Sequence, residues 1–596
     1  MTIWRMPDFR GRVEEAWHTL DAGDGGEAAE LIMAAMKLGG IDNLWFVSGS
    51  ELAALQEAGA KAKALGRPTP TIRTMLHEHA ALCAALGEAM VSGRPSCACA
   101  HVELGLLNMG GAIHIASRGG YPTLILTGAP ATAYPGSGPG DRSHTVYWQQ
   151  QIRDQGEIVR QYVKWDYKLA PYDNAGLTVT RALQVALTPP TGPVYLAMPH
   201  ESARTPIRGI QRFPTLAQLT PGRGPAADPA QLREVARMLI QAEAPVILTE
   251  RLGRNPAALA PFQELVELLG CRVIASGFRY NFPNPHPLRA PLPHRGFPDL
   301  EPYDAILIVD APTPWLPGTT SPRAGARIAW IDVDPIVTWI PMWEYPADYR
   351  LIADSALAIP ALLDEVQRQL TPADRRRIAA RRERLTAEGW AAIERERRAA
   401  EADGALEQIT PRYVAHVVGT LIDDETVVFG EGGPTAFIPR SKPGTLYFHG
   451  GASLGYSLSA AVGAKVAQPG RRFITLVGDG AYNFGLPSQS FWAARQYRAP
   501  FLAILFNNRG YSTGTTRLRD AYPDGWAVRT GDYSGGFFDP PPNYSAEAQA
   551  AGCFGAKVRR PEEVAPAIRR ALDAVDKEGI PAVIDVWLPK HITGEV

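Results

Sequence analysis

Short apolar runs without polar alternation recur along the chain, and segments of mixed polarity separate them. In the last third of the sequence, runs at 473–477 and 500–506 flank a stretch rich in alanine, glutamine, tryptophan and serine that is long enough for a helix. Uninterrupted apolar runs are typical of strands buried on both faces of a parallel sheet. The pattern therefore predicts a strand–helix–strand unit with parallel strands and a right-handed connection.

The same alternation along the whole chain predicts three α/β domains with doubly wound parallel sheets. The expected parts are an N-terminal domain at 1–204, a central α/β domain at 225–365, a helical linker at 366–405 and a C-terminal domain at 406–596. The expected strands lie at 44–47, 96–100, 124–127, 194–198, 246–248, 272–274, 305–309, 327–331, 426–429, 473–477, 500–506 and 582–587.

Several segments lie outside these strands. Residues up to about Gly25 lack a clear periodicity and are expected to form an extension over the body of the protein. The stretch 205–229 is rich in proline and glycine, which indicates a linker. A short segment at 353–355 is expected to close the central sheet. Residues 192–200 resemble residues 579–589 in sequence, which suggests that the first and third domains share a topology.

Polar residues follow both strands of the unit in the last domain. Gly478, Asp479 and Gly480 come directly after the first strand, and Asn507 and Asn508 close the second. Because the carboxyl ends of neighbouring parallel strands share one edge, a carboxylate and an amide oxygen can meet there on a hard cation such as Mg²⁺, with phosphates and water as its other ligands. Small residues at the next helix start would let a phosphate approach backbone N–H groups. The residues alone predict a metal–diphosphate site, with two ordinary turns as the alternative.

This arrangement resembles the thiamine diphosphate signature of the enzyme family that includes acetolactate synthase, benzoylformate decarboxylase and pyruvate decarboxylase. The resemblance covers nearly the whole chain and implies pyrimidine-binding, central and diphosphate-binding domains, in that order. It implies thiamine diphosphate and Mg²⁺ as cofactors, with Asp479, Asn508 and Gly510 as metal ligands. In the family the cofactor lies between the first domain of one subunit and the last domain of another, so a homodimer or homotetramer is expected.

A second group of candidates comes mainly from the first domain. Glu78 lies in the apolar helix start 75–87, where the residues alone fit either a helix N-terminal charge or a buried functional acid. The resemblance assigns it to the family's glutamate, which hydrogen-bonds the cofactor's aminopyrimidine ring and assists proton removal. His101 is similar to the histidine near the reacting carbon of benzoylformate decarboxylase, Ser50 to its carboxylate-binding serine, and His286 to another active-site histidine. A hydrogen-bonded loop histidine is the alternative for His101, and a structural one for His286.

The remaining cofactor contacts follow from the same resemblance. Leu454 would be the wedge between the two cofactor rings, and the carbonyl of Ala452 would accept a hydrogen bond from the pyrimidine amino group. An apolar wedge of this kind holds reacting atoms in a near-attack arrangement. The other expected contacts are Gly432, Gly433, Gly478, Gly480, Ala481, Tyr482, Asn508, Gly510 and Tyr511.

Composition narrows the classes of function. Charged residues make up 20% of the chain and the formal net charge is −1, which provides no basic field for nucleic acid. The sequence contains no run of about 18 apolar residues, so we expect no membrane span. The five cysteines lie in apolar contexts without a C-x-x-C pattern, which predicts reduced thiols and a cytoplasmic protein.

Together these features predict an enzyme that cleaves or forms a C–C bond next to a carbonyl group of a 2-oxo acid or related substrate. A 2-oxo acid decarboxylase and an acetolactate synthase-like carboligase are favoured, and a 2-hydroxyacyl lyase is an alternative. An FAD-assisted oxidase is a further alternative, but the segment 309–315 lacks the Gly- and Arg-bearing loop expected of flavin binders, so FAD is not expected. A catalytically silent subunit is disfavoured because Glu78, Asp479 and Asn508 are all present.

Overall fold

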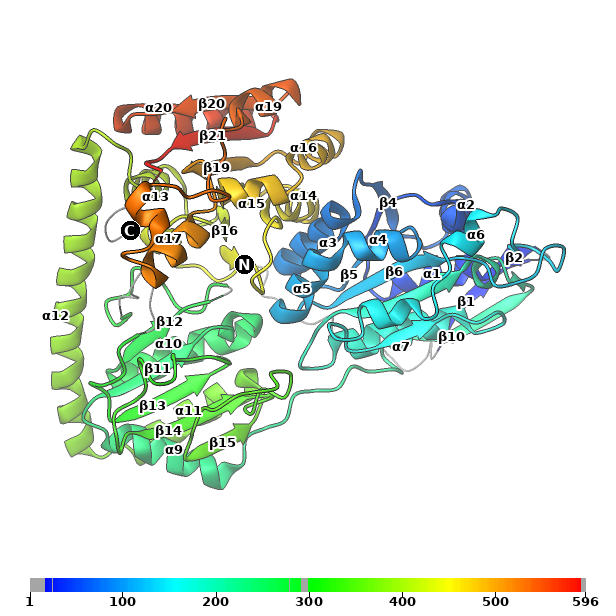
Figure 1. The fold of residues 1–596 in the computed structure, drawn as a ribbon. Helices are drawn as coiled ribbons and strands as arrows, with labels where there is room; N and C mark the ends of the chain where they lie inside the picture. The colour runs from blue at the N-terminus through cyan, green and yellow to red at the C-terminus, as the bar shows by residue number, and fades with distance from the viewer. Residues whose placement is uncertain (1–16, 24, 278, 291–297, 591–596) are drawn as a thin grey trace.

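The computed structural model describes residues 17–23, 25–277, 279–290 and 298–590. Three parallel sheets organise the chain, and their apolar residues pack into separate clusters on the two faces of each sheet. In the first sheet, for example, Trp45 packs with helix α3 (Glu78–Ser92), and its neighbours Leu44 and Phe46 pack with helices on the opposite face. The predicted α/β fold with doubly wound parallel sheets is therefore confirmed (Figure 1).

The first sheet has six parallel strands. Their order is β4 (Thr71–Thr74), β3 (Asn43–Phe46), β5 (Ser96–Ala100), β6 (Thr123–Ala129), β8 (Val194–Pro199) and β7 (Asp166–Lys168). Its main helices are α1 (Ala28–Leu38), α2 (Ala53–Ala64), α3, α4 (Val102–Asn108), α5 (Gly110–Gly119) and α7 (Ala175–Leu187).

The central sheet has five parallel strands, and a long helix connects it to the third domain. The strand order is β12 (Arg272–Ala275), β11 (Pro245–Thr249), β13 (Ala305–Val309), β14 (Arg327–Asp332) and β15 (Tyr349–Ile352). Its helices are α9 (Pro229–Gln241), α10 (Pro256–Leu269) and α11 (Ser355–Gln369), followed by α12 (Pro372–Ala402). Arg381 of α12 donates to the carbonyls of Leu269 and Ala242, which attaches the long helix to the central domain.

The third sheet repeats the strand order of the first. Its strands are β17 (Leu446–Phe448), β16 (Val427–Glu431), β18 (Phe473–Gly478), β19 (Leu502–Asn507), β21 (Ala582–Trp587) and β20 (Phe554–Val558). Its helices include α13 (Pro411–Leu421), α14 (Ser457–Ala467), α15 (Asp479–Phe484), α16 (Pro487–Gln496), α17 (Ser512–Ala521), α19 (Tyr544–Ala550) and α20 (Pro561–Asp573). In both sheets the second strand along the chain lies outside the first and the fifth lies outside the sixth, which confirms the shared topology.

The first and third domains touch through helices α3 and α14 (Figure 1). A Cβ added to Gly87 would lie 1.9 Å from the carbonyl oxygen of Ala460, and one added to Gly463 would lie 1.8 Å from that of Ala84. The two backbones are therefore in direct contact, which residues with side chains would prevent. The Tyr497 hydroxyl also donates to the carbonyl of Thr74 at 2.6 Å, so polar contact extends the junction.

Three local expectations need correction. The stretch 205–229 is not simply a linker, because β9 (Pro206–Ile207) and β10 (Ile210–Pro214) pair antiparallel with β2 (Gly26–Glu27) and β1 (Trp17–Asp21). The strand that closes the central sheet is β15, a few residues before the expected segment, because Asp354 instead caps α11. The connection between β18 and β19 contains two helices, α15 and α16, rather than one.

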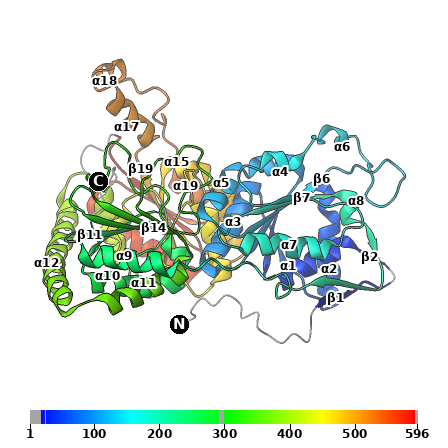
Figure 2. The same cartoon turned by 90° about the horizontal axis from the view of Figure 1, so that it is seen from below.

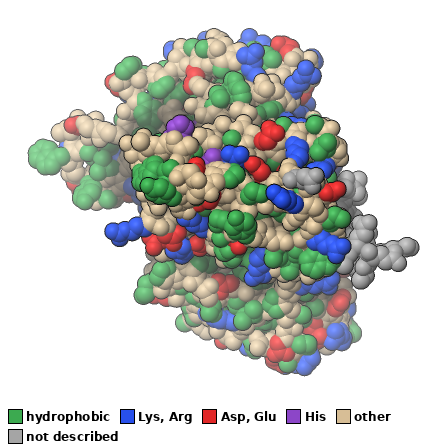
Figure 3. Space-filling model, turned by 90° about the vertical axis from the view of Figure 1, so that its right-hand side faces the viewer, with side chains coloured by type: hydrophobic (Ala, Val, Ile, Leu, Met, Phe, Trp, Pro, Cys, Tyr) green, Lys and Arg blue, Asp and Glu red, His purple; other side chains and the backbone are tan. Residues whose placement is uncertain are grey.

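The remaining expectations concern the surface and the termini. Residues 1–16 of the expected N-terminal extension lie outside the described residues, and the part that follows them forms β1. Side chains of both charge signs are interspersed over the face in Figure 3. Within the described ranges, every helix is too short or too polar to cross a bilayer.

Candidate functional site

Asp479 lies at the carboxyl edge of the third sheet, where β18 ends and α15 begins. Its side chain is 2% exposed, and its two oxygens accept hydrogen bonds from the N–H groups of Gly480 and Gly510, each at 2.9 Å. Burial raises the pKa of Asp479 to about 6, although these backbone hydrogen bonds act in the opposite direction. A desolvated carboxylate in this position gains stability from a cation.

Asn508 supplies the second oxygen at this edge. Its Oδ1 atom is buried and has no hydrogen-bond partner within the described chain, whereas Asn507 donates to Asp585 at 2.7 Å and is thereby held in the core. An unpaired buried acceptor is costly unless a donor or a cation satisfies it. The described residues contain no group of three or more His, Cys, Asp and Glu side chains that could hold a metal alone. The donor set thus fits a hard cation that takes further ligands from phosphate and water.

The glycines expected around a diphosphate lie at the same edge. Gly432 follows β16 and adjoins the backbone of Gly478, and Gly433 has a φ of +72° with the Phe506 ring 2.5 Å from an added Cβ. Residues with larger side chains would be strained at both positions. These glycines fit a phosphate that is held by backbone N–H groups.

The expected contacts around α15 divide into buried and accessible positions. Ala481 and Tyr482 are buried, and the Tyr482 ring packs against Tyr544 with centroids 5.0 Å apart. Their buried side chains pack inside the domain. Any contact of these two residues with a ligand would therefore be made by their backbone N–H groups in the first turn of α15. Tyr511 is exposed and stands over Gly480, at 3.0 Å from the position of an added Cβ.

The predicted wedge loop lies against the first domain of the same chain. Leu454 is 38% exposed, and the N–H of Ala452 donates to Nε2 of His114 on α5 at 3.4 Å. The carbonyl oxygen of Gly455, the residue after Leu454, is 3.2 Å from Nε2 of His79 on α3. The loop therefore connects the predicted cofactor edge of the third domain to the helix that begins with Glu78.

Glu78 is the first residue of α3. Its Oε2 accepts a hydrogen bond from the side-chain amide of Asn108 at 3.1 Å, and Nδ1 of His77 lies 3.9 Å from the same oxygen. The His77 side chain caps the helix by accepting from the N–H of His79. A carboxylate at this helix N-terminus is favourable to the helix dipole, and the Glu78 side chain is 13% exposed.

His101 follows β5 and is held on both ring nitrogens. Nδ1 lies 2.6 Å from Oε2 of Glu51, and Nε2 lies 2.9 Å from the side-chain nitrogen of Gln150. The hydrogen bond to Glu51 raises the pKa of His101, although burial of the ring opposes it. Glu51 is fully buried and also accepts from the N–H of Val102 at 3.3 Å, so it fixes the imidazole in place.

Sequence reasoning missed Glu51 and Gln150. Glu51 directly follows Ser50 in the turn after β3, and an acid beside a predicted ligand-binding serine is a signal that could have been used. Gln150 lies beyond a loop of about twenty residues after β6, so no local pattern connects it with His101.

The structure brings together three of the four predicted catalytic residues. Ser50 is exposed and adjoins Gly49, whose added Cβ would lie 2.4 Å from Nδ1 of His101. Glu78 is close enough to His101 to contribute to its raised pKa. His286 lies elsewhere, in the central domain, where its Nε2 is 3.2 Å from Glu267 of α10 and its ring packs edge-on against Phe282.

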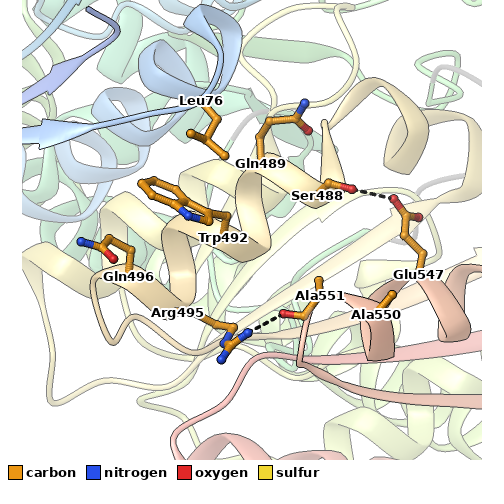
Figure 4. A pocket seen from close by; sticks show the side chains of 9 residues that line it. All are labelled: Leu76, Ser488, Gln489, Trp492, Arg495, Gln496, Glu547, Ala550 and Ala551. Carbon is orange, nitrogen blue, oxygen red and sulfur yellow. Dashed lines mark hydrogen bonds between the residues drawn. The ribbon is translucent and has the colours of Figure 1, made fainter.

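A separate groove lies beside the junction of the first and third domains. It has a volume of about 810 Å³ and is lined by Leu76 of the first domain and by residues of α16 and α19, including Trp492, Arg495 and Glu547 (Figure 4). None of the predicted site residues lines this groove, although its lining residue Leu76 lies only two positions before Glu78 in the chain. The polar side chains described above, rather than this groove, define the candidate site.

Two known domain families match parts of the chain. The N-terminal TPP-binding domain of thiamine pyrophosphate enzymes matches residues 26–158, and the C-terminal TPP-binding domain of these enzymes matches residues 433–586. The chain is 30% identical to benzoylformate decarboxylase of Pseudomonas aeruginosa over 73% of this chain and 78% of that protein. It is 22% identical to acetolactate synthase of Bacillus subtilis over 94% of this chain and 92% of that protein.

A solved structure supports the fold independently. The thiamine diphosphate-dependent 4-hydroxybenzoylformate decarboxylase of Rhodococcus jostii aligns with a TM-score of 0.72, covering 95% of this chain and 99% of its own at 22% identity. This likeness agrees with the three parallel sheets. From the two matched domains and the relative at 30% identity, we conclude that the chain belongs to the thiamine pyrophosphate enzyme family.

Proposed function

We propose that the protein is a thiamine diphosphate- and Mg²⁺-dependent decarboxylase of 2-oxo acids. The observation that carries the proposal is the buried, unpartnered Oδ1 of Asn508 beside the buried carboxylate of Asp479. These atoms lie at the sheet edge next to glycines that suit a diphosphate, and the helix of Glu78 packs against the same domain. Benzoylformate decarboxylase and 2-ketoarginine decarboxylase of Pseudomonas aeruginosa are among the relatives, which supports a 2-oxo acid as substrate.

Each group has a defined task in this proposal. Asp479, Asn508 and the carbonyl of Gly510 would hold the cation, which in turn would hold the diphosphate. Leu454 would keep the two cofactor rings in a bent arrangement. When bound, thiamine diphosphate supplies an electron sink for cleavage of the bond next to a carbonyl.

Residues of the first domain would bind the substrate and move protons. Glu78 would hold a proton at a ring nitrogen of the aminopyrimidine, and Ser50 would bind the substrate carboxylate. His101, oriented by Glu51, would transfer a proton at the reacting carbon of the substrate. These tasks suit the polar side chains at the carboxyl edge of the first sheet.

Acetolactate synthase-like carboligation is the second candidate. Acetolactate synthases align with up to 94% of this chain, which is more than the 73% that aligns with benzoylformate decarboxylase. A carboligase passes the cleaved acyl unit to a second carbonyl compound, whereas a decarboxylase releases an aldehyde. Both reactions use the same cofactor and the same Glu78.

Product identification separates the two candidates. Purified protein with thiamine diphosphate and Mg²⁺ would be incubated with aromatic and aliphatic 2-oxo acids, with and without an added acceptor. We expect CO₂ release with an aldehyde product, and a carbon–carbon ligation product as the main species would favour the second candidate. Absence of CO₂ release from every 2-oxo acid, in protein shown to bind the cofactor, would contradict both.

We also propose that the working form is a homodimer or homotetramer. The family pattern places the cofactor between two subunits, whereas the contact of α3 with α14 described here lies within one chain. Mixing a Glu78→Gln protein with an Asp479→Ala protein tests the arrangement. Sites shared between subunits regain activity on mixing, and sites built within one chain do not.

The five cysteines are buried and unpaired, which supports a reducing compartment such as the cytoplasm.

A further inference from the structure

Gly455, the residue that follows the predicted wedge Leu454, is held in an unusual backbone conformation. Its φ is +92°, and a Cβ added there would lie 2.4 Å from the backbone carbonyl of Phe484. Only glycine avoids that clash in this backbone conformation. A contact that fixes the position of the Gly455 peptide therefore also fixes the position of the adjoining Leu454 backbone.

Two buried ionisable side chains contact the two polar backbone groups of Gly455, its N–H and its carbonyl. Glu431, at the end of β16, accepts from its N–H and also from the N–H groups of Tyr456 and Ser457, at 3.1 and 3.0 Å. These bonds satisfy donors at the start of α14. The Gly455 carbonyl, on the other side, lies 3.2 Å from Nε2 of His79.

His79 is the donor in this second contact, because a carbonyl oxygen can only accept. Burial lowers the pKa of His79, which favours the neutral ring, and donation to the Gly455 carbonyl places the ring proton on Nε2. The sulfur of Cys83, one helical turn further on, lies 3.4 Å from the same nitrogen and packs beside it. His79 comes from the first domain and Gly455 from the third, so this bond connects the two domains. The domains adjoin each other in Figure 1 and Figure 2.

His79 is also the residue directly after Glu78. Helix α3 packs closely against α14, with backbone contact at Gly87 and Gly463. We propose that His79 is a positioning residue that fixes the Gly455 peptide, and with it the adjoining Leu454 side chain. This inference rests on the proposed function and adds the element that orients the predicted wedge, whichever subunit supplies the predicted proton-transferring acid.

Four variants test the proposal. His79→Leu removes the donor, His79→Gln keeps an amide N–H that can reach the carbonyl, and His79→Asn keeps an amide that is too short. Cys83→Ala is the matched control, because it removes the other neighbour of Nε2 and leaves the bond to Gly455. The readouts are kcat and KM with the best 2-oxo acid, the circular dichroism of bound thiamine diphosphate, and thermal unfolding of the cofactor-free proteins.

We expect His79→Leu and His79→Asn to lower kcat by roughly 10–10²-fold with little change in KM, since a small displacement of aligned groups has effects of that size. Their cofactor dichroism should differ from that of the wild type. His79→Gln should recover most of the rate and the spectrum, and Cys83→Ala should match the wild type. If His79→Leu does not fold, the Gln and Asn variants make the same comparison.

The proposal is overturned if His79→Asn and His79→Leu turn over at the wild-type rate with an unchanged spectrum. It is also overturned if His79→Gln is as impaired as they are, because packing of the ring would then account for the loss. These results differ from a failure of the proposed function. In that case the wild type itself would neither bind thiamine diphosphate nor release CO₂.

Discussion

The first and third domains use one strand order, yet the carboxyl edges of their sheets carry different chemistry. The ends of β3, β4 and β5 in the first sheet lead into Glu51, Glu78 and His101, which are groups that can bind and release protons. The corresponding strand ends of the third domain lead into Gly432, the Leu454 loop and Asp479. The same scaffold thus presents titratable side chains in one copy, and glycines, the predicted apolar wedge and the predicted metal ligands in the other.

The difference suggests how the two copies divide the work of the proposed reaction. The third domain would anchor and shape the cofactor, and the first would handle protons and substrate. Loops at the carboxyl edge can vary while the strands and the helix packing stay the same. If this division holds, changes at the third-domain edge should affect cofactor binding, and changes at the first-domain edge should affect turnover of bound cofactor.

The largest effect is expected for Asp479→Ala. Loss of a buried ligand should weaken Mg²⁺-supported binding of thiamine diphosphate by at least about 10²-fold, since even partners of metal ligands contribute 10–100-fold. Calorimetric titration measures it, and a chelator added to the wild type should have the same effect. Asp576→Ala, which changes an exposed aspartate of the same domain, is the control. Equal affinity in the Asp479 variant would remove the metal site from this edge.

Glu78→Gln should separate binding from turnover. We expect kcat to fall by roughly 10²–10⁴-fold, the usual range for a general acid or base, while cofactor affinity stays close to that of the wild type. Glu57→Gln alters an exposed glutamate on α2 and should be neutral. A Glu78 variant with near-normal steady-state turnover would refute its role.

A smaller change is expected at Glu51, and it can be read from the pH dependence. Glu51 raises the pKa of His101, so the carboxylate-free variant Glu51→Gln should lower it. Whichever form of His101 is active, the limb of the pH–rate profile that reports its titration should move to lower pH. His101→Ala should abolish that limb and lower kcat by about 10²-fold. An unmoved profile in Glu51→Gln would mean that another group titrates.

Gly463→Ala tests the packing that joins the two domains. The added methyl group would lie 1.8 Å from the carbonyl oxygen of Ala84, and we expect the free energy of unfolding to fall by roughly 1–3 kcal/mol. Denaturant titration measures it, with Gly470→Ala as the control because no atom lies within 4 Å of its added Cβ. Equal stability of the two variants would show that the helices separate easily.

The smallest effect on turnover is expected for His286→Gln. His286 contacts Glu267 and Phe282 within the central domain, away from Ser50 and His101. We expect kcat to stay close to the wild-type value and unfolding free energy to fall by about 1 kcal/mol, the size of one hydrogen bond. A large loss of turnover would support the catalytic role that the family resemblance assigns to this residue.

The strands that sequence reasoning identified share one property. Strands such as β3, β5 and β18 are buried along almost their whole length, so their sequences are continuous apolar runs. Strands β4, β7, β15, β17 and β20 were missed, and all lie at sheet edges. Exposed positions in β4 and β7 carry polar residues such as Thr71 and Lys168, so no apolar run marks them.

The candidate site was predictable where its residues follow strands within the chain. Asp479 and Asn508 stand directly after buried runs, and Glu78 stands alone in an apolar helix start. Contacts between distant segments left no pattern of this kind. Neither the bond from His79 to Gly455 nor that from His101 to Gln150 could be read from spacing, because each depends on how loops meet after folding.

The central claim is that the edges of the first and third sheets together form one thiamine diphosphate site. The most direct test is a calorimetric titration of thiamine diphosphate into the wild type, Glu78→Gln and Asp479→Ala, each with saturating Mg²⁺. We predict one cofactor per chain in the wild type and in Glu78→Gln, and binding that is at least about 10²-fold weaker in Asp479→Ala. Binding of wild-type affinity in Asp479→Ala, or a wild type that takes up no cofactor, would contradict the claim.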